Sequence, residues 1–355
     1  QFFMGKIDEF TLIARFFRSC APPEPSILGI GDDAALLPCA SALRGNRDDA
    51  SATLALTTDT LVAGSHFLPD FAPQDLGWKA LAVNLSDLAA MGAEPTAFLL
   101  ALTLPRYDPE WLEGFARGVQ ACAQRYGVAL IGGDTTRGPL AITITALGVV
   151  PWQAAIRRST AQVGDDLWVS GQPGRAALGL SVRTGRLSGD LPGCSEWIAA
   201  LERPQPRIAL GLALRGIATA MLDISDGLTQ DAHHLVETRP ELTLCVEEAA
   251  LPLAPLVAQG APAEKAWAAL LGGGDDYELL FTANPRHRTA VAEAARRAGV
   301  SVHRIGSVVP RSIPEASPLV LLRRDGTRTT LPPQGWDPFR VAEPLDLDIQ
   351  PESFS

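Results

Sequence analysis

The chain has 355 residues, enough for two domains that each bury their own hydrophobic core. Hydrophobic residues make up 46% of it and charged residues 20%, proportions that are typical of a globular protein. The formal net charge is −10, and no run is rich in lysine and arginine. These features argue against a surface that binds nucleic acid or an anionic membrane.

The five cysteines are scattered along the chain, without a CxxC pair or a pairing with histidine. The sequence therefore indicates neither a zinc site nor a disulfide framework, and it favours a reducing cytoplasm. The longest uncharged run, 138–156, contains two prolines and alternating threonines. It predicts a strand and a connector rather than a membrane span.

Hydrophobic periodicity and turn residues predict the elements of the first half in chain order. They are a helix at 9–17, a strand at 54–61, a helix from Lys79 that Gly92 ends, a buried strand at 97–105, a helix at 109–126, a strand that breaks into a turn at Gly132 and Gly133, and a strand at 140–150.

The same signals predict the elements of the second half. They are strands at 164–171, 242–246 and 301–309, strands that end at Asp223 and begin at Tyr277, helices at 176–187, 208–218, 227–236, 263–271 and 285–298, and a strand-turn-strand at 319–331. The region 188–206 is polar and rich in proline, so no element is predicted there.

Helices and strands of similar length occur in both halves, without the regular alternation that produces a parallel sheet. We therefore expect an α+β fold (mixed α/β) with mixed sheets flanked by helices. The expected domains lie side by side and cover 1–150 and 151–355.

The helix from Lys79 consists almost entirely of apolar or small residues, so most of its circumference is expected to be buried. Asn84 and Asp87 nevertheless lie three residues apart on one face. Burying an unpaired carboxylate is costly, so Asp87 needs a cation. The ordinary alternatives are a lysine or arginine partner, or the end of a nearby helix.

Six places share one design, in which an apolar segment runs into glycine, serine or threonine and then aspartate. They are Asp32/Asp33, Thr57/Thr58/Asp59, Asp87, Gly133/Asp134, Asp223/Ser225/Asp226 and Asp275/Asp276. Any one alone is most often a turn or a helix N-cap. Clustered without metal, so many carboxylates would repel one another strongly. Aspartate with serine or threonine offers the hard oxygen ligands that Mg²⁺ prefers.

The negative charge also restricts the ligand. An acidic site would repel a bare anion, but it accepts a polyphosphate carried by several Mg²⁺ ions that bridge carboxylates to phosphate oxygens. The usual nucleotide signatures are missing, because the chain has no P-loop, no kinase HRD and DFG set, and no GxGxxG at a strand-to-helix turn. Phosphate binding is therefore expected to use metal ions, glycine backbone and a few arginines.

Seven segments occur in order across Gly29–Thr282: GIGDDAALL, TTDTLVAGSHF, ALAVNLSDLAAMGAEP, LIGGDTTRGP, RRS, DISDGL and GDDYELLFT. With the tail sequence GWDPF, they resemble the thiamine-monophosphate kinase family of the ATP-dependent aminoimidazole ribonucleotide synthetase-like superfamily. The resemblance covers nearly the whole chain. It implies a homodimer with the active site in a cleft beside the subunit interface, and transfer of the ATP γ-phosphoryl group to thiamine monophosphate.

Carried over position by position, the resemblance implies three groups of site residues. The metal ligands are Asp33, Thr57, Thr58, Asp59, Asp87, Asp134, Asp223 and Asp226. The ATP contacts are Gly133, Asp134, Arg158 and Ser225, and the thiamine-phosphate contacts are His66, Asp275 and Trp336. The first domain then holds metal and ATP, and the tail of the second completes the substrate site. Where the family pattern reads GGEDYEL, this chain has GGGDDYEL, so the carboxylate of Asp275 is one methylene shorter.

The acceptor in such a reaction is a phosphate oxygen, which is already mostly ionised at neutral pH because its second pKa is about 6. No general base or covalent nucleophile is therefore assigned. The task is to align two polyanions and offset their charge, so the implied partners are ATP, thiamine monophosphate and several Mg²⁺ ions.

Simpler interpretations exist for several residues. His66 is also explained as a solvated loop residue, Arg158 as part of a solvated linker pair with Arg157, and Trp336 as a core position under the tail. His233 and His234 are predicted on the surface of a helix.

Alternative functions are another ATP-dependent enzyme of the superfamily, such as aminoimidazole ribonucleotide synthetase or selenophosphate synthetase, a hydrogenase-maturation scaffold, and a metal-dependent phosphohydrolase. Cys20 lies in SCAPPEP rather than a glycine-rich loop, which disfavours selenophosphate synthetase. The ending PESFS lacks the cysteine tail of the maturation proteins.

Overall fold

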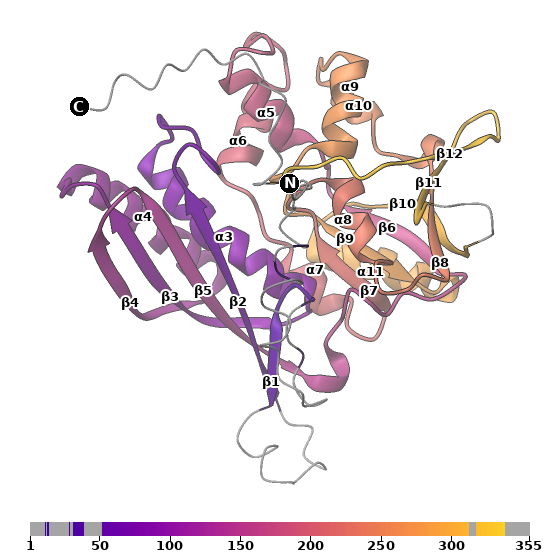
Figure 1. Cartoon of the computed structure of the whole chain (residues 1–355), viewed down its shortest axis with the longest axis horizontal. Helices are drawn as coiled ribbons and strands as arrows, with labels where there is room; N and C mark the ends of the chain where they lie inside the picture. Colours follow the sequence, from indigo (N-terminus) through magenta and orange to yellow (C-terminus); the bar gives the residue numbers. More distant parts are fainter. Residues whose placement is uncertain are drawn as a thin grey trace, which may run out of the picture.

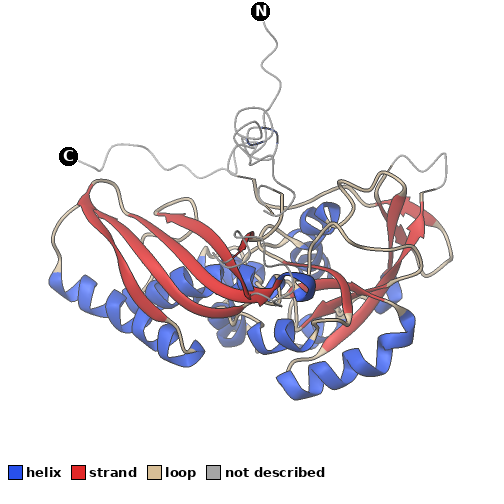
Figure 2. Cartoon of the chain, turned by 90° about the horizontal axis from the view of Figure 1, so that it is seen from below, coloured by secondary structure: helices blue, strands red, loops and turns tan. Residues whose placement is uncertain are grey.

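The computed structural model describes residues 11, 13, 28, 31–38, 52–311 and 317–337. In these residues the chain forms two mixed β-sheets side by side, with helices packed against them (Figure 1). Seen from below, most of the helices lie on one side of the sheets (Figure 2). The expected mixed fold with sheets flanked by helices is thus confirmed. Apart from Thr11 and Ile13, the predicted helix at 9–17 lies outside the described residues.

The first sheet has the strand order β1-β2-β5-β3-β4, with only β3 and β4 parallel. Its strands are β1 (Ala35–Pro38), β2 (Ala52–Val62), β3 (Glu94–Leu104), β4 (Ala129–Arg137) and β5 (Ala141–Pro151). Helices α3 (Pro73–Ala90) and α4 (Pro109–Tyr126) cover one of its faces (Figure 2). Every second residue of β5 is buried, as expected for a sheet covered on one face.

The sequence predicted a buried strand at 97–105, but strand β3 is buried on only one face. Phe98 and Leu102 are buried in the core, whereas Leu99 is 39% exposed. The apolar run predicted a strand inside a covered sheet, but the helices cover only one face of this sheet. The other face, which we call the open face, therefore carries apolar side chains that remain accessible in the single chain.

The segment at Gly132 and Gly133 does not form the predicted turn. It continues as β4, which runs parallel to β3. Gly133 has a φ of 148°, and a Cβ atom there would lie 1.8 Å from the carbonyl oxygen of Leu100. Glycine is therefore needed because the two strands approach closely, not because the chain reverses.

The second sheet has the strand order β12-β11-β8-β10-β6-β9-β7. Its strands are β6 (Asp166–Ser170), β7 (Ala218–Asp223), β8 (Leu242–Glu247), β9 (Leu279–Ala283), β10 (Val302–Pro310), β11 (Leu319–Leu322) and β12 (Arg328–Thr330). Its helices are α5 (Arg175–Arg183), α6 (Cys194–Glu202), α7 (Ile208–Ala213), α8 (Leu228–His234), α9 (Ala254–Ala258), α10 (Ala263–Gly272) and α11 (Arg288–Ala298), with 3-10 turns η2 (Trp152–Ala154), η3 (Glu248–Ala250) and η4 (Pro285–His287).

Two predictions for this half are wrong. The region 188–206 contains α6, which the prolines around it concealed; the helix buries Trp197 completely, and the Trp197 indole donates to the side chain of Gln259 at 2.8 Å. His233 and His234 are half-buried rather than on the surface. Burial also lowers the pKa of His233.

Helix α3 lies at the junction of the two halves. One side packs on the first sheet, and its last turn, at Ala89 and Ala90, joins a core with Leu210 of α7 and Met221 of β7. A Cβ atom on Gly211 would lie 2.1 Å from the carbonyl oxygen of Ala89, so the two helices approach closely. This position confirms that α3 is buried on most of its circumference and brings its polar residues close to β7.

The three cysteines in the described residues, Cys122, Cys194 and Cys245, are buried, and the thiols of Cys122 and Cys194 are free. Cys20 and Cys39 lie outside those residues. Among the described helices, none is both long enough and apolar enough to cross a membrane.

Packing of α3 on α4 predicts the effect of one methyl group. A Cβ atom on Gly118 would lie 1.9 Å from the carbonyl oxygen of Gln74, so Gly118→Ala should lower the free energy of unfolding by about 1–3 kcal/mol. Urea unfolding followed by circular dichroism measures this loss. Gln120→Ala, at an exposed position of the same helix, is the control and should change stability by less than about 0.5 kcal/mol. Equal stability of the two variants would contradict the packing.

Candidate functional site

Asn84 and Asp87 both contact β2 from α3. The side-chain oxygen of Asn84 accepts the backbone N–H of Asp59 at 2.9 Å, and its amide nitrogen donates to the carbonyl of Ala80 at 3.0 Å. The hydroxyl of Thr57 donates to Oδ2 of Asp87. Asn84 therefore satisfies a backbone donor of β2 and places Asp59 beside Asp87.

Asp87 lacks the ordinary ion-pair partner that the sequence left open. Within the described part of the chain, no lysine or arginine pairs with it. Its charged neighbours are Asp59, Asp223 and Asp33. Burial, and then these charges, raise the pKa of Asp87 well above its usual value.

We call Asp33, Asp59, Asp87 and Asp223 the acidic cluster. Its members come from the loop before β1, from β2, from α3 and from the end of β7. Burial raises the pKa of Asp33 well above normal and that of Asp223 to about 7. Within the described residues, Oδ2 of Asp33 and Oδ2 of Asp223 are buried without a hydrogen-bond partner. Carboxylates that repel one another and leave buried oxygens unpaired favour a bound cation.

Arg158 lies beside this cluster and is not a solvated linker residue. Its backbone N–H donates to Asp32, at 3.2 Å from Oδ1, and its guanidinium lies 3.9 Å from Oδ1 of Asp33. The side chain is only 13% exposed. Its neighbour Arg157 instead stacks over the ring of Trp152, at 4.5 Å. Asp32 thus fixes the backbone that carries Arg158.

The loop after β7 is held by a residue that the sequence analysis missed. One carboxylate oxygen of Asp231 accepts three consecutive backbone N–H groups, from Ser225 at 3.1 Å and from Asp226 and Gly227 at 3.0 Å. Asp231 is 5% exposed. The available signal was an aspartate in the first turn of a predicted helix, a common site for bonding to free N–H groups. Asp231 therefore sets the backbone that carries Ser225 and Asp226.

The three residues expected to contact thiamine phosphate lie together. The rings of His66 and Trp336 are 4.9 Å apart, and the backbone N–H of Trp336 donates to the carbonyl of Asp226 at 3.0 Å. Asp275 is near enough for its charge to act on His66. Trp336 is 39% exposed, so it is not a core residue.

The protonation of His66 follows from its contacts. Nδ1 accepts the backbone N–H of Val62 at 3.1 Å, and burial lowers the pKa of the ring. A neutral ring whose Nδ1 accepts a hydrogen bond carries its proton on Nε2. Nε2 of His66 is therefore a hydrogen-bond donor at neutral pH.

Thr58, Gly133 and Asp134 are not brought to the acidic cluster. The hydroxyl of Thr58 donates to the carbonyl of Ile144 and accepts from Thr145, whereas its neighbours Thr57 and Asp59 contact α3. Successive side chains point to opposite faces of a strand, so Thr58 lies on the open face.

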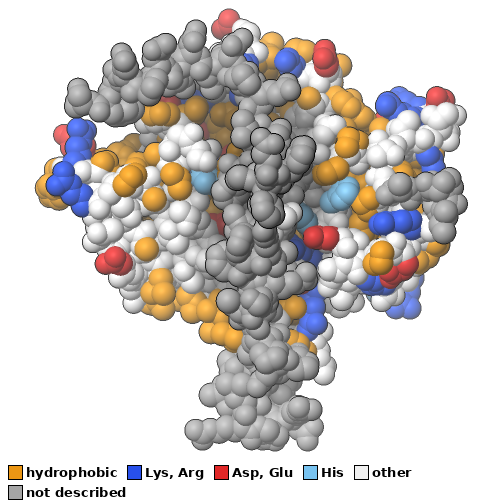
Figure 3. Space-filling model, in the orientation of Figure 1, with side chains coloured by type: hydrophobic (Ala, Val, Ile, Leu, Met, Phe, Trp, Pro, Cys, Tyr) orange, Lys and Arg blue, Asp and Glu red, His pale blue; other side chains and the backbone are white. Residues whose placement is uncertain are grey.

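Asp134 also lies on the open face, at the far edge of the sheet. Asp134 is exposed and pairs with Ala101 of β3. Ala101 pairs with Thr143 of β5, and Thr143 pairs with Thr60 of β2. Three strand spacings, roughly 14 Å, separate it from β2. The face seen in Figure 3 carries few charged side chains over the first sheet, where uncharged and hydrophobic ones predominate.

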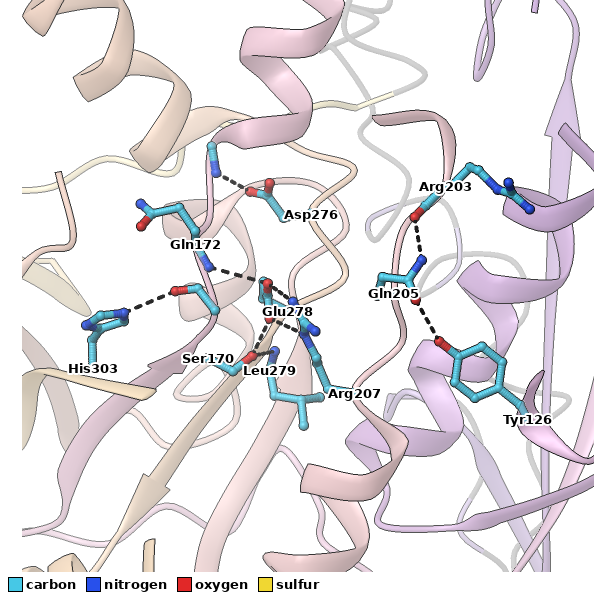
Figure 4. A network of polar contacts seen from close by, with 12 residues as sticks. Tyr126, Ser170, Gln172, Arg203, Gln205, Arg207, Asp276, Glu278, Leu279 and His303 are labelled. Carbon is cyan, nitrogen blue, oxygen red and sulfur yellow. Dashed lines mark hydrogen bonds and ion pairs between the residues drawn. The ribbon is translucent and has the colours of Figure 1, made fainter. Parts of the chain in front are cut away.

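A second network holds the loop that carries Asp275 (Figure 4). Glu278 is buried and accepts from Ser170 at 2.6 Å and from both donor arms of Arg207 at 2.6 and 2.5 Å. Asp276, which the sequence grouped with the possible ligands, accepts the backbone N–H of Gly174 at 2.8 Å at the start of α5. Burial raises the pKa of Asp276 well above normal. Asp276 therefore caps a helix.

The raised pKa values predict how stability depends on pH when no cation is bound. An unfolded aspartate titrates near 3.8, whereas folded Asp223 titrates near 7. Between these values the folded state binds a proton that the unfolded state lacks, so acidification stabilises the fold. The melting temperature in EDTA should rise by roughly 2 °C from about pH 8 to about pH 6. Asp223→Asn should flatten this change, and a melting temperature that falls over the same range would contradict it.

The chain is similar to known proteins in both sequence and structure. Residues 31–150 match the family described as AIR synthase related protein, N-terminal domain. The Escherichia coli thiamine-monophosphate kinase is 43% identical over 333 residues, which are 93% of this chain and 98% of that protein.

Two solved structures share the fold over most of the chain. The thiamine-monophosphate kinase from Stenotrophomonas maltophilia is 42% identical, with a TM-score of 0.71 over 82% of this chain and 90% of that one. AaThiL, complexed with AMPPCP and TMP, is 28% identical, with a TM-score of 0.76 over 95% of this chain and 99% of that one. The chain therefore belongs to the thiamine-monophosphate kinase family.

Proposed function

We propose that this protein transfers the γ-phosphoryl group of ATP to thiamine monophosphate, giving thiamine diphosphate and ADP. The observation that carries the proposal is the position of the acidic cluster. On one side, Asp33 of the cluster lies beside Arg158. On the other side, the charges of the cluster act on Tyr277, whose hydroxyl donates to Asp275. The relative complexed with AMPPCP, an ATP analogue, and TMP supports both substrates.

The residues present suit phosphoryl transfer without acid–base catalysis. The attacking atom is a phosphate oxygen that is largely ionised at neutral pH, so no side chain has to remove a proton. The protein must hold this oxygen in line with the γ-phosphate and offset the charge of two polyanions. The position of the Arg158 guanidinium, 3.9 Å from Oδ1 of Asp33, supports a contact with the nucleotide phosphates.

We further propose that Mg²⁺ binds at the acidic cluster, with Thr57 and Asp226 as additional ligands. The buried, unpaired oxygens of Asp33 and Asp223 fit such ions. Among the described residues, no three acidic, histidine or cysteine side chains are arranged to hold an ion by themselves. Phosphate oxygens of the bound nucleotide would complete the coordination. Bound Mg²⁺ would neutralise charge on the transferred phosphoryl group.

The substrate end of the site would be formed by His66, Trp336 and Asp275. Nε2 of His66 donates a hydrogen bond, Trp336 offers a flat surface for a thiamine ring, and the carboxylate of Asp275 attracts the cationic ring end. The hydrogen bond from the Ser225 N–H to Asp231 supports a role for Ser225 at the nucleotide end, because it fixes the backbone there.

The chain is proposed to consist of two domains, 1–150 and 151–355, that meet at α3. We also propose a cytoplasmic location, which the free thiols of Cys122 and Cys194 support.

We propose a homodimer in which a second copy covers the open face. This face and the β4 edge expose Val62, Leu99, Leu130 and Ile131, with exposed fractions of 37%, 39%, 54% and 60%. Such a surface suits an interface better than water. The same contact explains Asp134, which lies too far from the acidic cluster of its own chain to join it. Asp134 would complete the site of the partner.

The acceptor specificity tests the function. ADP formation from ATP and Mg²⁺ should require thiamine monophosphate, and unphosphorylated thiamine should not replace it because thiamine lacks the attacking phosphate oxygen. A coupled ADP assay, with chromatographic detection of thiamine diphosphate, measures both. ADP formation at the same rate without an acceptor would identify a phosphohydrolase and reject the kinase.

Mixing two inactive variants tests the shared site. Asp87→Asn and Asp134→Asn should each lose nearly all activity while keeping their melting temperature within about 3 °C of the wild type. After co-refolding in equal amounts, half of the dimers are mixed and each has one intact site, so activity should return to about one quarter of the wild type. No recovery, from variants shown to form mixed dimers, would place Asp134 in the site of its own chain.

A further inference from the structure

Lys79 is a charged residue in the interior of the molecule. Its side chain is 0% exposed, although it extends from the middle of α3. The ammonium lies 3.0 Å from Oδ1 of Asp275 and donates to the carbonyl of Leu201 at 3.1 Å. Leu201 is in the last turn of α6, where carbonyl groups lack helical partners and attract a cation. Lys79 thus links α3 to two segments of the second half.

Asp275 has its two oxygens in different surroundings. Oδ1 takes both bonds, from Lys79 and from the hydroxyl of Tyr277 at 3.0 Å. No residue in the described ranges donates to Oδ2, and the side chain is 31% exposed. The backbone also holds the residue, because Asp275 has a φ of 65° and its N–H donates to the carbonyl of Ser225 at 2.8 Å.

We propose that Lys79 is a positioning residue for substrate recognition, and that it fixes the carboxylate of Asp275 so that its second oxygen receives the ring end of thiamine monophosphate. The inference rests on the proposed function. Lys79 is too deeply buried to touch the substrate, so it acts through Asp275. The ring end carries an amino donor and a positive charge, which a carboxylate oxygen binds, whereas the phosphate end is repelled.

The neighbouring residues agree with this role. The charges of both Lys79 and Asp275 act on His66, so the pair lies beside the rings of His66 and Trp336. Burial, and then the charge of Asp275, raise the pKa of Tyr277 well above normal, so its hydroxyl keeps its proton and donates. Two donors on one oxygen leave the carboxylate little freedom to rotate.

The test compares steady-state kinetics of Lys79→Met with the wild type. Its KM for thiamine monophosphate should rise at least tenfold, while kcat and the KM for ATP stay within about twofold. Lys265→Met, which removes an exposed lysine, is the control and should match the wild type. Asp275→Asn should raise the same KM. Because Lys79 acts through Asp275, the double variant should have the KM of Asp275→Asn alone.

The opposite results are equally specific. An unchanged KM for thiamine monophosphate, a fall in kcat alone, or independent additive effects in the double variant would overturn the inference. If Lys79→Met does not fold, the double variant decides, because it buries no unpaired charge. A wild-type protein without thiamine monophosphate-dependent ADP formation would reject the proposed function instead.

Discussion

Two opposite charges on one helix, the buried Lys79 and the half-buried Asp87, govern the site. Helix α3 is enclosed by the first sheet on one side and by α7 and β7 at its end, so a charge on it cannot rely on water. Lys79 and Asp87 lie eight residues apart, or about 12 Å along the axis. Lys79 is paired with Asp275 and the carbonyl of Leu201, whereas in the described part of the chain the side chain of Asp87 is bonded only by the hydroxyl of Thr57. On this helix Lys79 therefore has a partner of opposite charge, whereas Asp87 has none among the described residues.

The aspartates around α3 divide into two kinds. Asp32, Asp231 and Asp276 accept backbone N–H groups and shape the loops. Asp33 and Asp223 have buried oxygens without such partners in the described residues. Backbone hydrogen bonds offset part of the cost of burying the first kind, and these bonds fix the loops that carry the second kind. Neighbours in the sequence can differ in kind, as Asp32 and Asp33 do.

The sequence predicted the parts of the molecule that depend on local pattern. Alternating and helical periodicity placed β2, α4 and the hairpin of β11 and β12, and the apolar composition of the helix with Asp87 predicted its burial. The role of Asp276 as a cap could not be predicted, because it depends on α5, a hundred residues away in the chain. The burial of Lys79 likewise depends on α6, which the sequence analysis missed.

The face of the sheet to which each strand residue points could not be predicted from the sequence either. Thr57 and Thr58 are adjacent threonines of the same motif, yet they point to opposite sides of the sheet, and only the register with β5 shows which one contacts α3. The glycine of a turn and the glycine of two closely packed strands also look alike in sequence, so Gly133 was misassigned. Both errors concern long-range pairing rather than local preference.

The carboxylate of Asp231 has a consequence for how nucleotides are held. Three successive main-chain amides make a concave anion nest of the sort that cradles phosphate in many nucleotide enzymes. Here the protein's own side chain already fills that nest. These three main-chain amides are therefore already occupied, so a bound polyphosphate would be attracted by Arg158 and by the counter-ions that it carries in. A nucleotide from which a chelator has removed the divalent ions would be repelled by the carboxylates of the acidic cluster.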